Sequence, residues 1–204
     1  MALGLQESAQ TVDPTRIHRP GGAAPAGQGS GTGALAAHKP TLSEASRKAF
    51  EREIAKYPPE GKASAVIACL AVLQEEHGWI SQESEQLVAE ALDMPVIAVH
   101  EVTTFYNMFN QVPVGRVKLN VCTNLPCQLR GGQHALEHLC GSLGVAEGGT
   151  TADGAFTVQK AECLGACADA PVLLVNDRQM VSFMSDARLD ELVSSLRAQS
   201  AATA

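Results

Sequence analysis

The sequence predicts an α/β protein in which a small helical bundle is followed by a small sheet covered by helices. Three observations lead to this fold class. Apolar residues recur at helical spacing between about residues 41 and 111. From about residue 116 to 197, short apolar strands alternate with helical segments. Gly, Ala and Pro dominate residues 1–40, which show no periodicity for burying apolar surface, so a disordered tail is expected there.

Four helices are expected between residues 41 and 111, because each has a signal for its start or its end. The start signals are Thr41 or Ser43, Ser64, Ser81 and Pro95. The first two helices are expected to end at Pro58-Pro59 and Gly78. Apolar positions at helical spacing are Phe50, Ile54, Tyr57, Val66, Ile67, Leu70, Leu73, Leu87, Val88, Ala91, Leu92, Val102, Phe105, Tyr106 and Phe109. These faces predict a bundle, with Phe105, Tyr106 and Phe109 in its core.

The second region is expected to contain four strands and two helices in the order β, α, β, β, β, α. The strands are 117–121, 156–158, 172–175 and 180–183, and the helices are 128–143 and one that begins at Ser185 or Asp186. A tight turn at Asn176-Asp177 joins the last two strands as a hairpin. This order is typical of thioredoxin-like domains. It places the segments that follow the first two strands at one end of the sheet.

Four of the six cysteines form two close pairs in these segments. The pairs are Cys122 with Cys127, in Cys-Thr-Asn-Leu-Pro-Cys, and Cys163 with Cys167, in Cys-Leu-Gly-Ala-Cys. A two-iron cluster needs two thiolates for each iron, so one pair for each iron is the arrangement expected of a [2Fe-2S] centre. Glycines in or next to both segments, at 131, 132 and 165, allow backbone N–H groups to approach the sulfurs.

Other chemistries fit the cysteine spacing less well. Structural zinc sites and reactive dithiols usually have two residues between paired cysteines, a spacing absent here. The four-iron pattern is also missing. Cys69 and Cys140 are expected to pack in helices. His134 to His138 match the zinc-protease pattern His-x-x-Glu-His, but the absence of an apparent third ligand favours a solvated helix face.

Composition excludes several function classes. A net charge of −7 argues against nucleic-acid binding through a basic face. No run approaches the roughly 18 apolar residues needed to cross a bilayer, so direct membrane insertion is not expected. Residues 1–40 lack the apolar core of a secretory signal, which predicts a cytoplasmic protein in a reducing compartment. The glycines of residues 27–33 do not fit a phosphate loop, so no nucleotide site is expected.

Several motifs resemble the 24-kilodalton, or E, subunit of bacterial respiratory complex I. They are Gly78-Trp79-Ile80, Val102-Thr103-Thr104-Phe105-Tyr106, Val121-Cys122-Thr123-Asn124-Leu125-Pro126-Cys127, Glu162-Cys163-Leu164-Gly165-Ala166-Cys167 and Ala170-Pro171. The resemblance implies a thioredoxin-like domain, residues 116–197, in which Cys122, Cys127, Cys163 and Cys167 hold one [2Fe-2S] cluster. It also implies that the helical domain, residues 41–111, docks onto a flavoprotein that binds NADH and FMN.

The expected function is therefore electron transfer within NADH:quinone oxidoreductase, without a catalytic residue in this chain. The cluster exchanges single electrons with the FMN of the partner, and FMN and NADH bind only to that partner. Other peripheral-arm subunits would connect the chain to the inner face of the plasma membrane. Two alternatives stay open: the equivalent subunit of an NAD-dependent formate dehydrogenase or NAD-reducing hydrogenase, and a free-standing thioredoxin-like ferredoxin. A metal-free interaction module is a third, weaker hypothesis.

Overall fold

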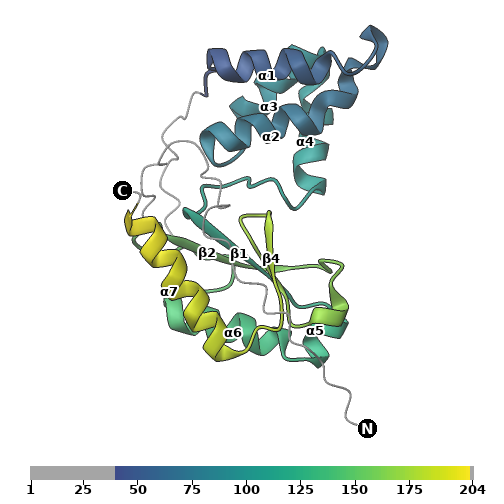
Figure 1. Cartoon of the computed structure of the whole chain (residues 1–204). Helices are drawn as coiled ribbons and strands as arrows, with labels where there is room; N and C mark the ends of the chain where they lie inside the picture. Colours follow the sequence, from purple (N-terminus) through teal and green to yellow (C-terminus); the bar gives the residue numbers. More distant parts are fainter. Residues whose placement is uncertain (1–39, 203–204) are drawn as a thin grey trace.

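The computed structural model describes residues 40–202 of the 204-residue chain, so the predicted tail, apart from residue 40, lies outside the described residues. Figure 1 shows a group of helices above a small sheet that is flanked by further helices. The helical unit contains α1 (Glu44–Ile54), a 3₁₀ segment (Pro59–Ala65), α2 (Val66–His77), α3 (Gln82–Leu92) and α4 (Val96–Phe105). The α/β unit contains β1 (Val117–Cys122), α5 (Leu125–Leu129), α6 (Gly132–Leu143), β2 (Phe156–Ala161), a 3₁₀ turn (Cys167–Asp169), β3 (Leu173–Val175), β4 (Gln179–Val181) and α7 (Asp186–Ala202).

The predicted start and stop signals position most helices of the helical unit. The Ser43 hydroxyl accepts a hydrogen bond from Ser46 N at 3.1 Å and so caps α1. Ser81 caps α3 in the same way. Gly78 ends α2 with a φ of 82°, a left-handed conformation that glycine adopts at little cost. The four helices bury a shared core: Phe50, Ala65, Val66, Cys69, Leu70, Leu73, Ile80, Val88, Ala89, Leu92, Val99 and Phe109.

Two predictions for the ends of these helices are wrong. Tyr57 lies beyond the end of α1 and is 40% exposed. Pro58 disfavours helical geometry at the residue before it, so the apolar spacing continues past the helix. At the other end of the unit α4 stops at Phe105, and Tyr106 adopts an extended conformation. Phe105 is therefore 79% exposed rather than buried, and only Phe109 reaches the core.

The beginning of α2 also differs from the prediction. A 3₁₀ segment occupies 59–65, and regular α-helix begins at Val66 rather than at Ser64. Pro58 precedes this segment, and Pro59 occupies its first position, where a missing backbone N–H costs little. Ile67, predicted on the buried stripe of α2 with Val66, Leu70 and Leu73, is 36% exposed. The buried positions are Val66, Cys69, Leu70 and Leu73, and Ile67 lies beside this stripe.

The sheet has the strand order β2-β1-β3-β4. β1 and β2 are parallel, with pairs running from Val117 and Phe156 to Cys122 and Ala161, whereas the other two pairings are antiparallel. The predicted hairpin turn is confirmed, because Asn176 and Asp177 have φ values of 51° and 55°. Gly131, with a φ of 93°, divides the predicted helix 128–143 into α5 and α6.

The α/β unit has a second, separate core. All six residues of β1 are buried. α6 covers one face of the sheet, and α7 packs beside α6 (Figure 1). The core side chains include Leu119, Val121, Leu136, Leu139, Phe156, Val158, Leu173, Leu189, Leu192 and Leu196. No helix between residues 40 and 202 is long and apolar enough to span a bilayer.

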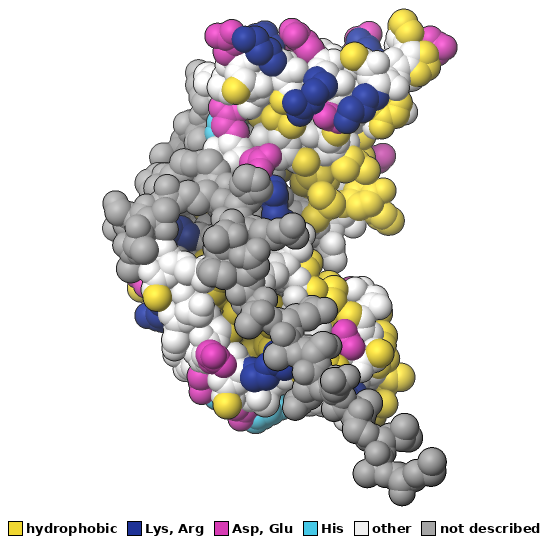
Figure 2. Space-filling model, in the orientation of Figure 1, with side chains coloured by type: hydrophobic (Ala, Val, Ile, Leu, Met, Phe, Trp, Pro, Cys, Tyr) yellow, Lys and Arg dark blue, Asp and Glu magenta, His cyan; other side chains and the backbone are white. Residues whose placement is uncertain are grey.

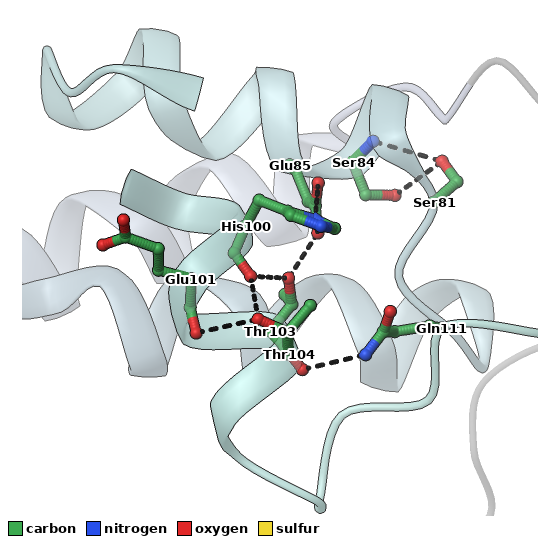
Figure 3. Close-up of polar contacts among 8 residues, drawn as sticks. All are labelled: Ser81, Ser84, Glu85, His100, Glu101, Thr103, Thr104 and Gln111. Carbon is green, nitrogen blue, oxygen red and sulfur yellow. Dashed lines mark hydrogen bonds and ion pairs between the residues drawn. The ribbon is translucent and has the colours of Figure 1, made fainter. Parts of the chain in front are cut away.

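Glu85 is a buried carboxylate that fastens α3 to α4. Its side chain is 5% exposed, accepts a hydrogen bond from the Thr103 hydroxyl and lies 3.0 Å from His100 Nδ1 (Figure 3). Thr103 Oγ1 also lies 3.0 Å from the His100 carbonyl oxygen. A buried carboxylate is stable only with such partners, so this contact selects the way in which the two helices meet.

We expect Glu85→Ala to destabilise the helical unit by about 2–3 kcal/mol, because Thr103 would lose a buried, charge-assisted acceptor. Thermal unfolding followed by circular dichroism measures this change. Glu101→Ala is the matched control, since Glu101 is an exposed glutamate on the same pair of helices. Equal melting temperatures for the two variants would contradict a structural role for the buried carboxylate.

Candidate metal centre

The first cysteine pair is buried at the end of the central strand. Cys122 is the last residue of β1 and is 2% exposed, and Cys127 is 1% exposed. Cys127 lies in the short helix α5 rather than in a loop as predicted. Pro126 occupies the first turn of α5, where its fixed φ favours a helix start. The turn of α5 brings Cys127 into the same buried apolar cluster as Cys122.

The second pair follows β2 and lies at the surface. Cys163 and Cys167 are both exposed, and their sulfur atoms are 3.9 Å apart. Two thiolates on one tetrahedral metal lie roughly 3.8 Å apart, if the metal–sulfur bonds are about 2.3 Å as they are for zinc. Gly165 between them has a φ of 79°, which lets the chain reverse and bring both sulfurs to one side. The pair is thus spaced to bind one metal ion.

The parallel pairing of β1 and β2 brings the two pairs together. Cys122 is in register with Ala161, so both cysteine segments leave the same end of the sheet. Thr123 N donates to Ala161 O at 3.2 Å, and Asn124 Nδ2 donates to Glu162 Oε2 at 2.6 Å. These two bonds hold the segments side by side.

Packing and one further hydrogen bond complete this convergence. Leu164 and Ala166, from between the second pair, pack against the apolar cluster that contains Cys122 and Cys127. Arg130 Nε donates to the Ala170 carbonyl at 2.9 Å, which ties the end of α5 to the chain just after Cys167. The contact of Arg130 with Ala170 was not predicted from the sequence. Side-chain to backbone hydrogen bonds of this kind have no signature in the sequence.

Gly132 allows the backbone to pack tightly behind the first pair. A Cβ atom at this position would lie 2.7 Å from Cys122 O and 2.9 Å from both C and O of Cys127. These atoms belong to the backbone, so they cannot move aside as a flexible side chain does. Glycine is therefore required here for close approach, as the sequence predicted for this segment.

Burial and contact with the paired cysteine raise the pKa of one thiol in each pair. Burial, and then the neighbouring Cys122 thiol, raise the pKa of Cys127, although a hydrogen bond with the Val172 backbone opposes the rise. The hydrogen bond with Cys163 raises the pKa of Cys167. Metal ligation requires thiolates, so loading of the site is favoured as pH rises.

The four cysteines do not surround a single point. Within the part of the chain that the structure describes, no three His, Cys, Asp or Glu side chains converge on one metal-ion position. The sulfurs instead form two adjacent pairs, and a two-iron core uses one pair for each iron. The donor set and its arrangement therefore fit a [2Fe-2S] cluster.

The other two cysteines lie away from this centre. Cys69 is fully buried in the helical core, and burial raises its pKa to about 11, as for a thiol that only packs. Cys140 is partly buried on α6 and packs against the core of the α/β unit.

The histidines of the His-x-x-Glu-His pattern pair with carboxylates rather than facing solvent alone. His134 Nε2 lies 3.0 Å from Asp186 and His138 Nε2 lies 2.8 Å from Asp190, so both histidines link α6 to α7. The hydrogen bond with His134 lowers the pKa of Asp186.

The sequence model of the thioredoxin-like [2Fe-2S] ferredoxin family matches residues 50–197, which include all four paired cysteines. This chain belongs to that family. Its cofactor is one [2Fe-2S] cluster, as the sequence predicted.

Two relatives are similar over most of their lengths. NADH-quinone oxidoreductase subunit 2 of Thermus thermophilus is 41% identical over 149 residues, which cover 73% of this chain and 82% of that protein. The E subunit of NADH-quinone oxidoreductase from Rickettsia prowazekii is 40% identical over 144 residues, which cover 70% of this chain and 81% of that protein. The predicted resemblance to the complex I family is confirmed.

Solved structures of an NAD⁺-reducing [NiFe]-hydrogenase contain a similar region. The air-oxidised form is 26% identical with a TM-score of 0.51, covering 57% of this chain and 20% of that chain. The H₂-reduced form is 24% identical with a TM-score of 0.58, covering 66% of this chain and 22% of that chain. This chain therefore matches only about a fifth of the hydrogenase chain, and the likeness to the H₂-reduced form shows a shared fold alone.

We expect Gly132→Ala to reduce cluster content and to destabilise the α/β unit by about 1–3 kcal/mol, because the new methyl group meets backbone atoms. Iron analysis and thermal unfolding measure the two effects. Gly141→Ala is the matched control on α6, where a Cβ atom meets nothing within 4 Å. It should leave iron content unchanged and stabilise the helix by about 0.5–1 kcal/mol. Equal iron loading in the two variants would argue against the close approach.

Proposed function

We propose that this chain is the electron-transfer subunit of an NADH:quinone oxidoreductase. In this proposal Cys122, Cys127, Cys163 and Cys167 hold the [2Fe-2S] cluster, and the cluster exchanges single electrons with the FMN of an NADH-oxidising flavoprotein. The observation that carries it is the meeting of two cysteine pairs at one end of parallel strands, in a chain about 40% identical to known components of NADH-quinone oxidoreductase.

The unequal exposure of the two pairs supports a role in exchange with a partner. The buried pair anchors one side of the site in the sheet, and the exposed pair puts the other side at the surface. A bound cluster supplies a site that takes up one electron at a time. NADH delivers two electrons together as hydride, so a flavin must stand between NADH and such a site. The NADH and FMN sites are assigned to the partner.

Exposed apolar side chains support docking by both units. Phe105, Met108 and Val112 are exposed at the end of the helical unit, and Leu125 and Leu129 are exposed on α5, beside the cysteines. Figure 2 shows hydrophobic surface in both places, on the same flank of the molecule. Apolar patches of this kind are typical of protein–protein contacts. We assign residues 41–111 as a docking domain and residues 116–197 as the cluster domain. In this proposal the chain associates with the membrane only through partner subunits.

The ligand assignment is tested by replacing cysteines one at a time. Cys122→Ala and Cys163→Ala should each lower iron and sulfide content about tenfold or more, because each removes a thiolate that nothing nearby replaces. The electron paramagnetic resonance signal of the reduced protein should disappear with the iron. Cys69→Ala and Cys140→Ala are the controls and should keep the visible absorption. Bleaching by Cys140→Ala would refute the proposed ligand set.

A second candidate is the diaphorase subunit of an NAD-reducing hydrogenase. The structural likeness to the air-oxidised hydrogenase, at 26% identity, favours it over a formate dehydrogenase or a free-standing ferredoxin. Affinity purification of the full chain from its own cells separates the candidates. Co-purification with NADH-dependent quinone reduction supports the first function, whereas H₂-dependent NAD⁺ reduction supports the second. A lone monomer without a flavoprotein would favour the ferredoxin.

A further inference from the structure

Few direct contacts determine how the helical unit sits on the α/β unit. In the described residues, α1–α4 pack on one another and the strands pack with α5–α7, but contacts between the two sets are sparse. The connecting segment, residues 106–116, contains neither helix nor strand. With so few contacts between the helices of one unit and the strands and helices of the other, rotation of one unit against the other is the default expectation. Specific polar contacts must therefore hold the orientation.

Asn110 is a residue of the connecting segment that contacts both units. Three of its hydrogen bonds go to the helical unit: its N–H donates to Gln74 Oε1 at 2.6 Å, its carbonyl accepts from Ile80 N at 2.7 Å, and its side-chain nitrogen donates to Gly78 O at 3.3 Å. The remaining side-chain oxygen accepts from Lys118 Nζ at 2.7 Å. Lys118 belongs to β1, so Asn110 joins the helices to the central strand.

Lys118 carries a buried charge at this junction. Its side chain is 3% exposed, and Nζ lies 2.5 Å from Asp177 Oδ2 in the β3–β4 turn. Asp177 Oδ1 in turn accepts from Asn120 Nδ2 at 2.5 Å. Asn176 Oδ1 accepts a hydrogen bond from Lys118 N, and Asn176 N donates one to Lys118 O. Both backbone groups of Lys118 therefore hold the turn against β1.

A buried ion pair of this kind contributes geometric specificity more than stability. Lys118 and Asp177 both belong to the α/β unit, so their ion pair fixes the position of the ammonium. Rotation of the helical unit would remove the Asn110 acceptor and leave a buried N–H of Lys118 without its partner. A further ion pair between the units, Arg178 with Glu75, is about half exposed on both sides, and exposed pairs contribute little. The orientation therefore depends on the buried contact.

We propose that Asn110, Lys118 and Asp177 form a polar joint that holds the helical unit at one fixed angle to the cluster-bearing sheet. The joint lies near the start of β1, and Cys122 lies at the end of the same strand. A change of angle at the joint therefore moves the cysteine end relative to the helical unit. For electron exchange, which rests on the proposed function, these three are positioning residues. They set where the cluster stands when the helices are docked.

The angle between the helical unit and the sheet is tested in the full chain, without any partner protein. A spin-labelled non-natural amino acid replaces Glu51, which is exposed on α1, and pulsed electron paramagnetic resonance gives its distance distribution to the reduced cluster. We expect one narrow distribution for the parent protein. Asn110→Ala removes the acceptor but leaves the Lys118–Asp177 pair, and it should broaden the distribution about twofold or more, as does Lys118→Met.

Two matched variants separate positioning from loss of structure. Asn110→Asp keeps the oxygen acceptor for Lys118 but loses the side-chain donor to Gly78 O, so its distribution should be narrower than that of Asn110→Ala. Lys160→Met makes the same change at an exposed lysine of the neighbouring strand and should leave the distribution narrow. Visible absorption should be unchanged in every variant, since no replaced residue contacts a cysteine.

A narrow distribution in both Asn110→Ala and Lys118→Met would overturn the joint, as would a broad one in the parent protein. If Lys118→Met fails to fold, the comparison of the distance distributions of Asn110→Ala and Asn110→Asp tests the joint. Because no flavoprotein or NADH enters the measurement, failure of the proposed function leaves this result standing. Conversely, a narrow distance distribution in every variant would overturn the joint without contradicting the assignment of the cysteine ligands.

Discussion

The parallel pairing of β1 with β2 is the constraint on which the centre depends. Because the two strands run in the same direction and in register up to Cys122 and Ala161, the segments that follow them leave the sheet at the same end. An antiparallel arrangement of the same strands would place the cysteine pairs at opposite ends of the sheet. The α6 crossover makes the parallel pairing possible and contributes core side chains that bury β1. The strand pairing that builds the sheet core thus also brings the two cysteine pairs together.

Sequence patterns predicted the elements that local chemistry controls. Caps at Ser43 and Ser81, the left-handed end at Gly78 and the Asn176-Asp177 turn each depend on a few adjacent residues, and all four are present. The cysteine spacing also led to the family and its cofactor. Expectations about burial were less successful, since Phe105 follows an apolar period that outlasts its helix. Periodicity reports a face but not the residue at which the helix ends.

The contacts between distant segments could not be predicted. Asn124 with Glu162, Arg130 with Ala170 and Lys118 with Asp177 join residues 38 to 59 positions apart, and each pair is polar and common in type. Their partners are chosen by the fold and not by neighbours in sequence. For the same reason a buried lysine in a strand, at position 118, had no visible signature.

Position 177 in the hairpin turn must both adopt a positive φ and supply a carboxylate to Lys118, which restricts the residues that suit it. Positions with positive φ ordinarily tolerate glycine best, because glycine has no Cβ to strain the backbone. At position 177 glycine would suit the backbone and yet leave the Lys118 ammonium without its carboxylate. Asparagine would suit the backbone and keep a neutral acceptor, but it would leave the buried positive charge without a counter-charge. Of the side chains that readily enter this conformation, aspartate alone supplies both shape and charge.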